Sequence, residues 1–342
     1  MSTTSLIWRR LIRAKDAKSP LRSLMVGLAR GARLLVRAPD GILFDWLSLR
    51  NSPIRASSDR SVAYRLESRF RRMLGLPFML NFSKVEIELT TLCNLSCNNC
   101  DRSSGQARSA EAMSVDQIAR FISESIKHGK RWRKIVIQGG EPLLHPEILQ
   151  ILEMFVEYKK SFSPGTFLRI TTNGWGSRVR DVLKSIPREV FVMNTGKIPK
   201  DDEGHVEITG RDEPIFDTYH SAPMDVLDAT RYKSIDFSAG CRIAEECGMG
   251  LTRYGYFPCG AGASVARVFG LDVGVKSLAE ITTKQFRDSL DTLCRRCGHF
   301  KTCSRHEFPE SVSRQSSDQV TSVTWHGALE TFKQRKDDSS VY

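Results

Sequence analysis

Three cysteines fall within one ten-residue stretch, TLCNLSCNNC (91–100), as Cys93, Cys97 and Cys100. Their spacing is C-x3-C-x2-C. A closed tetrahedral metal site takes four ligands and disulfides take an even number of thiols, so three clustered thiols fit neither use. Three thiolates on one loop can instead hold three irons of a [4Fe–4S] cube, which leaves the fourth iron open to bind another molecule.

The chain contains nine cysteines, and the other six follow position 240. They are Cys241, Cys247, Cys259, Cys294, Cys297 and Cys303. The odd total and the tight spacings favour metal binding or catalysis over a disulfide framework. Four basic residues between positions 9 and 15 interrupt any apolar segment of a secretory signal. We therefore expect reduced thiols and a cytoplasmic protein.

The composition is that of a globular protein with an uneven charge distribution. The 342 residues are 40% hydrophobic and 26% charged, which allows one large domain or two smaller ones. No stretch approaches the roughly 20 apolar residues of a membrane span. Residues 1–80 hold 16 Lys and Arg against 5 Asp and Glu, so they supply +11 of the net charge of +12. The remainder is near neutral, and we expect no specific nucleic-acid binding.

Residues 1–80 are expected to form a basic, mostly helical segment. Within them, 23–38 has a helical period, with apolar residues on one side and arginines on the other. Two interpretations remain open. The helix lies on an anionic membrane surface, which would place the protein at the inner face of a membrane, or it packs on the main domain with its arginines in water.

From position 84 onward, strand and helix patterns alternate, which predicts an α/β fold with a parallel sheet. The predicted strands are 84–92, 134–140, 166–174 and 189–196, and the predicted helices are 114–128, 146–160 and 177–186. This alternation of strands and helices ends after residue 196. We expect mostly loop over 197–225, another strand within 231–240, no long periodic element over 241–306, and a polar tail over 308–342.

Two further motifs follow the second and third predicted strands. They are QGGEPLLHPEI (138–148), with Gly139, Gly140, Glu141 and Pro142, and ITTNG (170–174). With the cysteine loop after the first strand, these motifs resemble the radical SAM superfamily. The resemblance implies a partial (β/α)6 barrel of the TIM type, within a core domain spanning 81–240.

The resemblance also implies roles for particular residues. The open iron would bind the amino and carboxylate groups of S-adenosylmethionine, and Glu141 or neighbouring backbone would receive the ammonium group. Thr172 and Asn173 would reach the ribose or carboxylate, or else form local turn bonds. Asn99 stands where the family usually has an aromatic residue beside the adenine. An electron from a flavodoxin or ferredoxin would lead to a 5′-deoxyadenosyl radical, which removes a substrate hydrogen.

Residues 241–307 resemble the auxiliary-cluster extensions called SPASM and, in shortened form, twitch domains. The match is partial, because Glu307 stands where SPASM domains have a cysteine and no cysteine follows. The twitch interpretation gives one auxiliary [4Fe–4S] cluster four ligands, Cys241, Cys259, Cys294 and Cys297. Cys247 and Cys303 are then spare. A zinc site remains the alternative, with the ligands Cys294, Cys297, Cys303 and His306.

The segment DTYHSAPMD (217–225) offers candidate catalytic side chains in Tyr219, His220 and Asp225. The tyrosine could relay a radical and the others could take a proton, or each could bond locally within a loop. We expect oxidation or epimerisation of a small polar or carrier-linked substrate of the sugar, aminocyclitol or nucleotide type. A ribosomal-peptide maturase and a non-catalytic Fe–S or zinc sensor are the alternatives.

Overall fold

The computed structural model describes residues 62–97, 99–107, 110–196, 198–199, 206–207, 219–228, 230–306, 321–335 and 342. The chain divides into two compact units, Met1–Arg50 and Asn51–Tyr342, and every described residue belongs to the second. The basic helix predicted at 23–38 therefore lies outside the described residues. Within them, no helix is long and apolar enough to cross a membrane.

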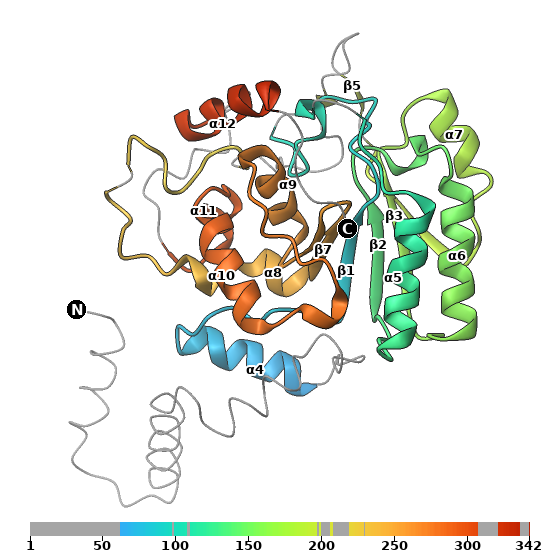
Figure 1. The fold of residues 1–342 in the computed structure, drawn as a ribbon, viewed down its shortest axis with the longest axis horizontal. Helices are drawn as coiled ribbons and strands as arrows, with labels where there is room; N and C mark the ends of the chain where they lie inside the picture. The colour runs from blue at the N-terminus through green and yellow to red at the C-terminus, as the bar shows by residue number, and fades with distance from the viewer. Residues whose placement is uncertain are drawn as a thin grey trace, which may run out of the picture. The chain divides into compact units, whose positions relative to one another are not determined.

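A six-stranded sheet forms the centre of the fold, in the order β4-β3-β2-β1-β7-β8 (Figure 1). Its strands are β1 Lys84–Glu88, β2 Lys134–Gln138, β3 Phe167–Thr172, β4 Val190–Asn194, β7 Met249–Thr252 and β8 Gly255–Phe257. Neighbouring strands are parallel except for β8, which forms an antiparallel hairpin with β7. The predicted α/β class is confirmed. In the described part of the chain the sheet is open, and its fifth parallel strand comes from 249–252, beyond the predicted core.

Three helices, α5 Val115–Lys127, α6 Ile148–Ser161 and α7 Ser177–Leu183, follow β1, β2 and β3 and lie on one side of the sheet (Figure 1). Ser114 begins α5 with a capping box, because its side chain accepts from Gln117 N and its own N–H bonds the Gln117 side chain. Phe121 of α5 contacts Trp132 and Phe155 at ring-centroid distances of 5.5 and 6.1 Å, within the main hydrophobic core.

On the other side of the sheet lie four helices that the sequence pattern did not reveal (Figure 1). They are α8 Arg242–Glu246, α9 Gly260–Phe269, α10 Thr283–Cys294 and α11 His299–Cys303. One of them, α9, packs on β1, β7 and β8. The expectation of no long periodic element over 241–306 was wrong. Residues 260–268 are all buried in α9, so this helix lacks the solvent-exposed polar face of a surface helix.

Helix α4, Val62–Met73, and the extended segment that follows it pack on the C-terminal half of the chain. The N–H of Phe78 donates to the carbonyl of Ala239 at 2.9 Å, and Arg287 donates to the carbonyl of Phe78. Phe82 stacks on Phe286 at 5.8 Å. The described part of the predicted N-terminal segment therefore contains a helix and also contributes to the main core.

One further expectation, a strand within 231–240, was wrong. Residues 231–240 form turns and a short 3-10 helix, Phe237–Ala239, in place of a strand, because Gly240 takes a left-handed φ of 70° and Phe237 is buried beneath α10. The predicted polar tail contains helix α12, Val323–Gln334. Its Trp325 is fully buried and donates to the carbonyl of Arg296 at 2.5 Å. The remaining short elements are β5 Ile198–Pro199, β6 Val206–Glu207, and 3-10 turns at Ser104–Gln106, Pro142–Leu144 and Leu278–Glu280.

Candidate functional site

The glycine turn after β2 lies directly against the start of the cysteine loop. Gly140 N donates to the carbonyl of Thr90 at 2.7 Å, and Glu141 N donates to the carbonyl of Leu92 at 2.7 Å. A Cβ atom on Gly139 would lie 2.3 Å from the Thr90 oxygen, and one on Gly140 would lie 2.3 Å from the Leu92 oxygen. Both positions therefore need glycine, because any side chain would push the turn away from the loop.

Glu141 joins this turn to the end of β3. Its side chain is fully buried, and its carboxylate accepts hydrogen bonds from Thr172 Oγ1 at 2.8 Å, Asn173 N at 2.7 Å and Leu143 N at 3.1 Å. A buried carboxylate that accepts three hydrogen bonds is held in a fixed position. Because these three donors already occupy the carboxylate, we favour the backbone of the turn as the recipient of an ammonium group.

Thr172 and Asn173 form both local and long-range contacts. Asn173 Oδ1 accepts from Trp175 N at 2.8 Å, and Thr172 Oγ1 accepts from Gly174 N at 3.1 Å, so the expected strand-end turn is present. Asn173 Nδ2 also donates to Asn94 Oδ1 at 2.9 Å and lies 3.9 Å from Cys93 Sγ. The end of β3 thus contacts the first cysteine of the motif.

The three thiols of the loop lie close enough to influence one another. Burial raises the pKa of Cys93 to about 12, and the neighbouring Cys100 and Cys97 contribute in the same direction. Burial likewise raises the pKa of Cys100. These two thiols would be protonated in the free protein, whereas metal coordination deprotonates a thiol outright. Three neighbouring thiols on one loop are the kind of donors that anchor a metal centre such as the iron–sulfur cube.

Asn99 connects the cysteine loop to the segment that follows residue 218. It takes a left-handed φ of 48°, which asparagine tolerates better than an aromatic residue does. Its Oδ1 accepts from His220 N at 3.3 Å. The ring of His220 is buried, its Nε2 lies 3.2 Å from Ser103 Oγ, and its Nδ1 has no hydrogen-bond partner in the described part of the chain. Burial lowers the pKa of His220 to about 4, so the ring is neutral near pH 7.

The other two candidate catalytic side chains have structural partners. Tyr219 is fully buried, and its hydroxyl donates to the carbonyl of Ala261 in α9 at 3.0 Å. Asp225 accepts from Leu227 N at 2.9 Å and from Thr324 N in α12 at 3.1 Å. Of the three candidates, His220 is the one that contacts the cysteine loop and keeps a ring nitrogen unpartnered among the described residues.

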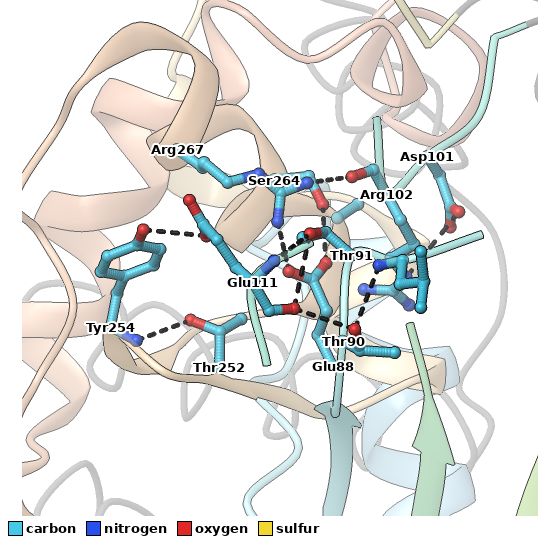
Figure 2. Close-up of polar contacts among 12 residues, drawn as sticks. Glu88, Thr90, Thr91, Asp101, Arg102, Glu111, Thr252, Tyr254, Ser264 and Arg267 are labelled. Atoms are coloured by element: carbon cyan, nitrogen blue, oxygen red, sulfur yellow. Dashed lines mark hydrogen bonds and ion pairs between the residues drawn. The ribbon is translucent and has the colours of Figure 1, made fainter. Parts of the chain in front are cut away.

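Two buried ion pairs anchor the second half of the loop, and sequence reasoning missed them. Arg102 pairs with Glu86 of β1 at 2.7 Å, while Arg267 of α9 pairs with Glu88 and donates to the Arg102 carbonyl (Figure 2). All four side chains are at most 9% exposed. The available signal was the alternation KVEIE, which places two glutamates on one face of a central strand.

The four cysteines expected to be auxiliary ligands line one small, mostly apolar cavity. It is lined by Cys241, Ile243, Ala244, Cys259, Ala261, Gly262, Leu290, Leu293, Cys294, Cys297, His299 and Phe300. Cys247 and Cys303 are not among its lining residues. His306 lies outside it too and stacks on Phe300 at a ring-centroid distance of 5.8 Å. Cys303 is nevertheless near enough to Cys241 and Cys297 to contribute to raising their pKa values.

The local structure suits metal-binding thiolates at this cavity. Cys241 and Cys259 occupy the N-cap positions of α8 and α9, and Cys259 Sγ accepts from Gly262 N at 3.3 Å. Burial raises the pKa of Cys259 to about 11 and that of the other three further still. No group of three or more His, Cys, Asp or Glu side chains among the described residues could hold a single metal ion. The same finding applies to the zinc ligands considered over 294–306, to the three cysteines of the loop and to the four cysteines of the cavity, so none of these sets surrounds a single ion.

Comparison with known families bears on the loop, the glycine turn and the end of β3 together. Residues 87–194 match the model of the radical SAM superfamily. This segment is a radical SAM domain. It runs from β1 to the end of β4, so it contains the three-cysteine loop, the Gly139–Pro142 turn and the Thr172–Asn173 contact.

Several curated proteins share parts of this radical SAM domain. A probable GTP 3′,8-cyclase of Methanococcus maripaludis strain C5 is 34% identical over 89 residues, which is 26% of this chain and 27% of that protein. A probable GTP 3′,8-cyclase of Pyrococcus horikoshii is 33% identical over 127 residues, or 33% and 38% of the two chains. The 7-carboxy-7-deazaguanine synthase of Rickettsia prowazekii is 28% identical over 138 residues, or 40% and 52%. The chain thus spans about half or less of the length of these relatives.

Solved structures also match. The crystal structure of BtrN in complex with AdoMet and 2-DOIA is 15% identical and covers 70% of this chain and 96% of that chain, with a TM-score of 0.37. The structure of selenomethionine-labelled BtrN in an open conformation gives a TM-score of 0.33 at 14% identity, covering 69% and 96% of the two chains.

Proposed function

We propose that this protein is a radical SAM enzyme that uses S-adenosylmethionine to remove a hydrogen atom from a small polar or carrier-linked substrate. The observation that carries the proposal is the contact between Gly139 and Gly140 and residues 90–92, which fixes the glycine turn beside the three thiols. A zinc or sensor site would not need this turn. When bound, the cluster and S-adenosylmethionine would supply a 5′-deoxyadenosyl radical.

The chain's own residues would prepare the site in three ways. Cys93, Cys97 and Cys100 would hold the cluster, and Asn173 would fix the orientation of Cys93 through its amide. The backbone of the 139–142 turn would receive the ammonium group of S-adenosylmethionine. His220, neutral and next to the loop, would offer its Nδ1 to a ligand. The buried residues on both sides of the cysteine loop would keep water away from a radical.

We further propose that Cys241, Cys259, Cys294 and Cys297 hold an auxiliary [4Fe–4S] cluster. Their shared cavity, with apolar side chains between them, supports this ligand set. Four protein thiolates would close the coordination of that cluster, so it would accept or pass electrons and would not bind the substrate. This arrangement suits an oxidation, because a substrate radical that loses a proton must give up an electron.

A nucleotide-type or sugar-type substrate is favoured within this proposal. Relatives over part of the radical SAM domain carry the names GTP 3′,8-cyclase and 7-carboxy-7-deazaguanine synthase, which supports purine-related substrates. The source of electrons is proposed to be a flavodoxin or ferredoxin. The membrane contact expected for 23–38 stays a prediction, since that helix lies outside the described residues.

The test is anaerobic reconstitution of the full chain with iron and sulfide, followed by addition of a reductant and S-adenosylmethionine. We expect 5′-deoxyadenosine and methionine as products. Replacing Cys93, Cys97 and Cys100 with alanine should abolish both, because these thiolates are the proposed protein anchors for that cluster. Continued formation of 5′-deoxyadenosine by the triple variant would overturn the proposal.

A further inference from the structure

On one face of the sheet, the polar side chains of β1 and those of β2 and β3 differ in whether they have partners. Along β1, Glu86 and Glu88 point to the side opposite Val85 and Ile87, and both are paired with arginines. The parallel register joins Glu86 to Val136 of β2, and Val136 to Arg169 of β3. Since side chains alternate along a strand, Arg169, Gln138 and Thr171 lie on the same face as the glutamates.

The polar side chains on β2 and β3 lack the partners that the β1 glutamates have. Three of their atoms are shielded from solvent and form no hydrogen bond within the described residues: Gln138 Nε2, Arg169 Nε and Thr171 Oγ1. Buried polar atoms without partners are uncommon in folded proteins and each needs an explanation. Three of them at neighbouring positions of one sheet face indicate a place where a ligand supplies the missing bonds.

The half of this face formed by β2 and β3 carries positive charge. Arg169 and Lys134 form no ion pair with any described residue, and the nearby carboxylate of Glu86 is already bonded to Arg102. Burial, together with the positive charges of Arg169 and Lys84, lowers the pKa of Lys134 to about 8. Like charges held together at a partly buried surface repel one another, and a bound anion would remove this repulsion.

The same half-face lies next to the candidate site. Gln138 directly precedes Gly139, and Thr171 directly precedes Thr172, whose side chain bonds Glu141. Arg169 lies two residues before Thr171 on β3, or about 7 Å farther from the cysteine loop at the usual rise along a strand. Phe191, the register partner of Arg169 on β4, is 54% exposed beside it and offers an apolar surface.

We propose that Arg169, with Lys134, binds an anionic group of the substrate, a phosphate or a carboxylate, while Gln138 and Thr171 hydrogen-bond its hydroxyl groups. This inference rests on the proposed function, because it places the ligand on the path toward the cysteine loop. The guanidinium fork matches the two oxygens of either anion. The hydroxyl-bearing part then lies nearest the loop, where the hydrogen atom would be removed.

The test compares three probes on one sugar ring, glucose 6-phosphate, glucuronate and neutral glucose, by calorimetry with the reconstituted full chain. We expect binding of at least one anion, with glucose weaker by about tenfold or more, since it lacks the charge-assisted bonds. The phosphate and carboxylate probes show which anion is preferred. Arg169→Gln should weaken anion binding by about tenfold or more, and Arg169→Lys less, because lysine keeps the charge without the fork.

Two further variants make the result specific. Arg178→Gln, on the exposed surface of α7, is the matched control and should bind like the wild type. Thr171→Val keeps the shape of the side chain, and it should weaken both anions a few-fold even if Arg169→Gln folds poorly. Equal binding of glucose and the anions, no binding of either anion at millimolar concentration, or unchanged binding by Arg169→Gln would overturn the site. Cleavage of S-adenosylmethionine by the wild type separates these outcomes from failure of the proposed function, which would show as no 5′-deoxyadenosine at all.

Discussion

The two cysteine regions of this protein are built in opposite ways. Cys93, Cys97 and Cys100 lie on one short loop, are partly exposed, and are surrounded by hydrogen-bonding groups from the turns after β2 and β3. Cys241, Cys259 and the pair Cys294 and Cys297 come from three segments, are buried, and line an apolar cavity. The first set therefore has polar groups beside it, whereas the second lies among apolar side chains. Under the proposed function, the first set would form a reactive centre and the second a closed one.

The largest effects are expected when each set of cysteines is replaced by alanine. In the Cys93/Cys97/Cys100 alanine variant, we expect no formation of 5′-deoxyadenosine and about four irons retained per chain. In the Cys241/Cys259/Cys294/Cys297 alanine variant, we expect about four irons lost and cleavage of S-adenosylmethionine retained. Iron and sulfide analysis with product assays on both proteins checks this. If either variant lost all its iron, the two centres would not be independent.

The buried ion pair beneath the loop should give the next largest effect. Arg102→Gln leaves Glu86 buried without its partner, so the free energy of unfolding should fall by about 3–5 kcal/mol. The matched change near the auxiliary region is Arg295→Gln, which breaks a pair with Asp291 that is more than a third exposed on both sides. That pair should contribute about 0–1 kcal/mol. Denaturant unfolding of the two variants measures the contrast, and equal losses would contradict it.

Gly140→Ala should affect the reactive centre alone. The added Cβ would meet the Leu92 carbonyl at 2.3 Å. It would force the turn and the cysteine loop apart, at a cost of about 1–3 kcal/mol. We expect weaker binding of S-adenosylmethionine and lower cluster occupancy at Cys93, with the auxiliary iron unchanged. Gly165→Ala is the control, because no atom lies within 4 Å of the position that its methyl group would take. Wild-type binding by Gly140→Ala would show that the close approach is not needed.

The contrast between the two regions also explains what the sequence could predict. The cysteine loop, the Gly139–Pro142 turn and the four strands from 84 to 196 are encoded by local spacing and alternation, so the sequence alone predicts them. The auxiliary ligand set follows from resemblance, and its common cavity depends on the tertiary packing of α8, α9 and α10. No local pattern indicates that β7 pairs with β1, more than 150 residues earlier.

Other elements escaped prediction because their signals are not local. Helix α9 is buried on nearly all sides, so it lacks the exposed polar face by which a surface helix is recognised. The ion pairs of Glu86 and Glu88 join β1 to partners in a loop and in α9, which alternation along β1 cannot specify. The side chain of Asn99, at the position that departs from the family pattern, bonds the backbone of His220 across more than 100 residues.

The smallest effect is expected at the two cysteines outside the cavity, and it sharpens the assignment of the closed centre. Cys247 lies near Lys84 and Glu86 at the start of β1, and Cys303 is half-buried at the end of α11. Cys247→Ala and Cys303→Ala should each keep the full iron content, and the free energy of unfolding should change by about 1 kcal/mol or less, since a small thiol is replaced by a methyl group. Cys259→Ala, made in parallel, should lose the auxiliary iron, because Cys259 lines the cavity. Loss of iron in Cys303→Ala together with retention in Cys259→Ala would reassign the ligands and leave Cys303 as a member of the set.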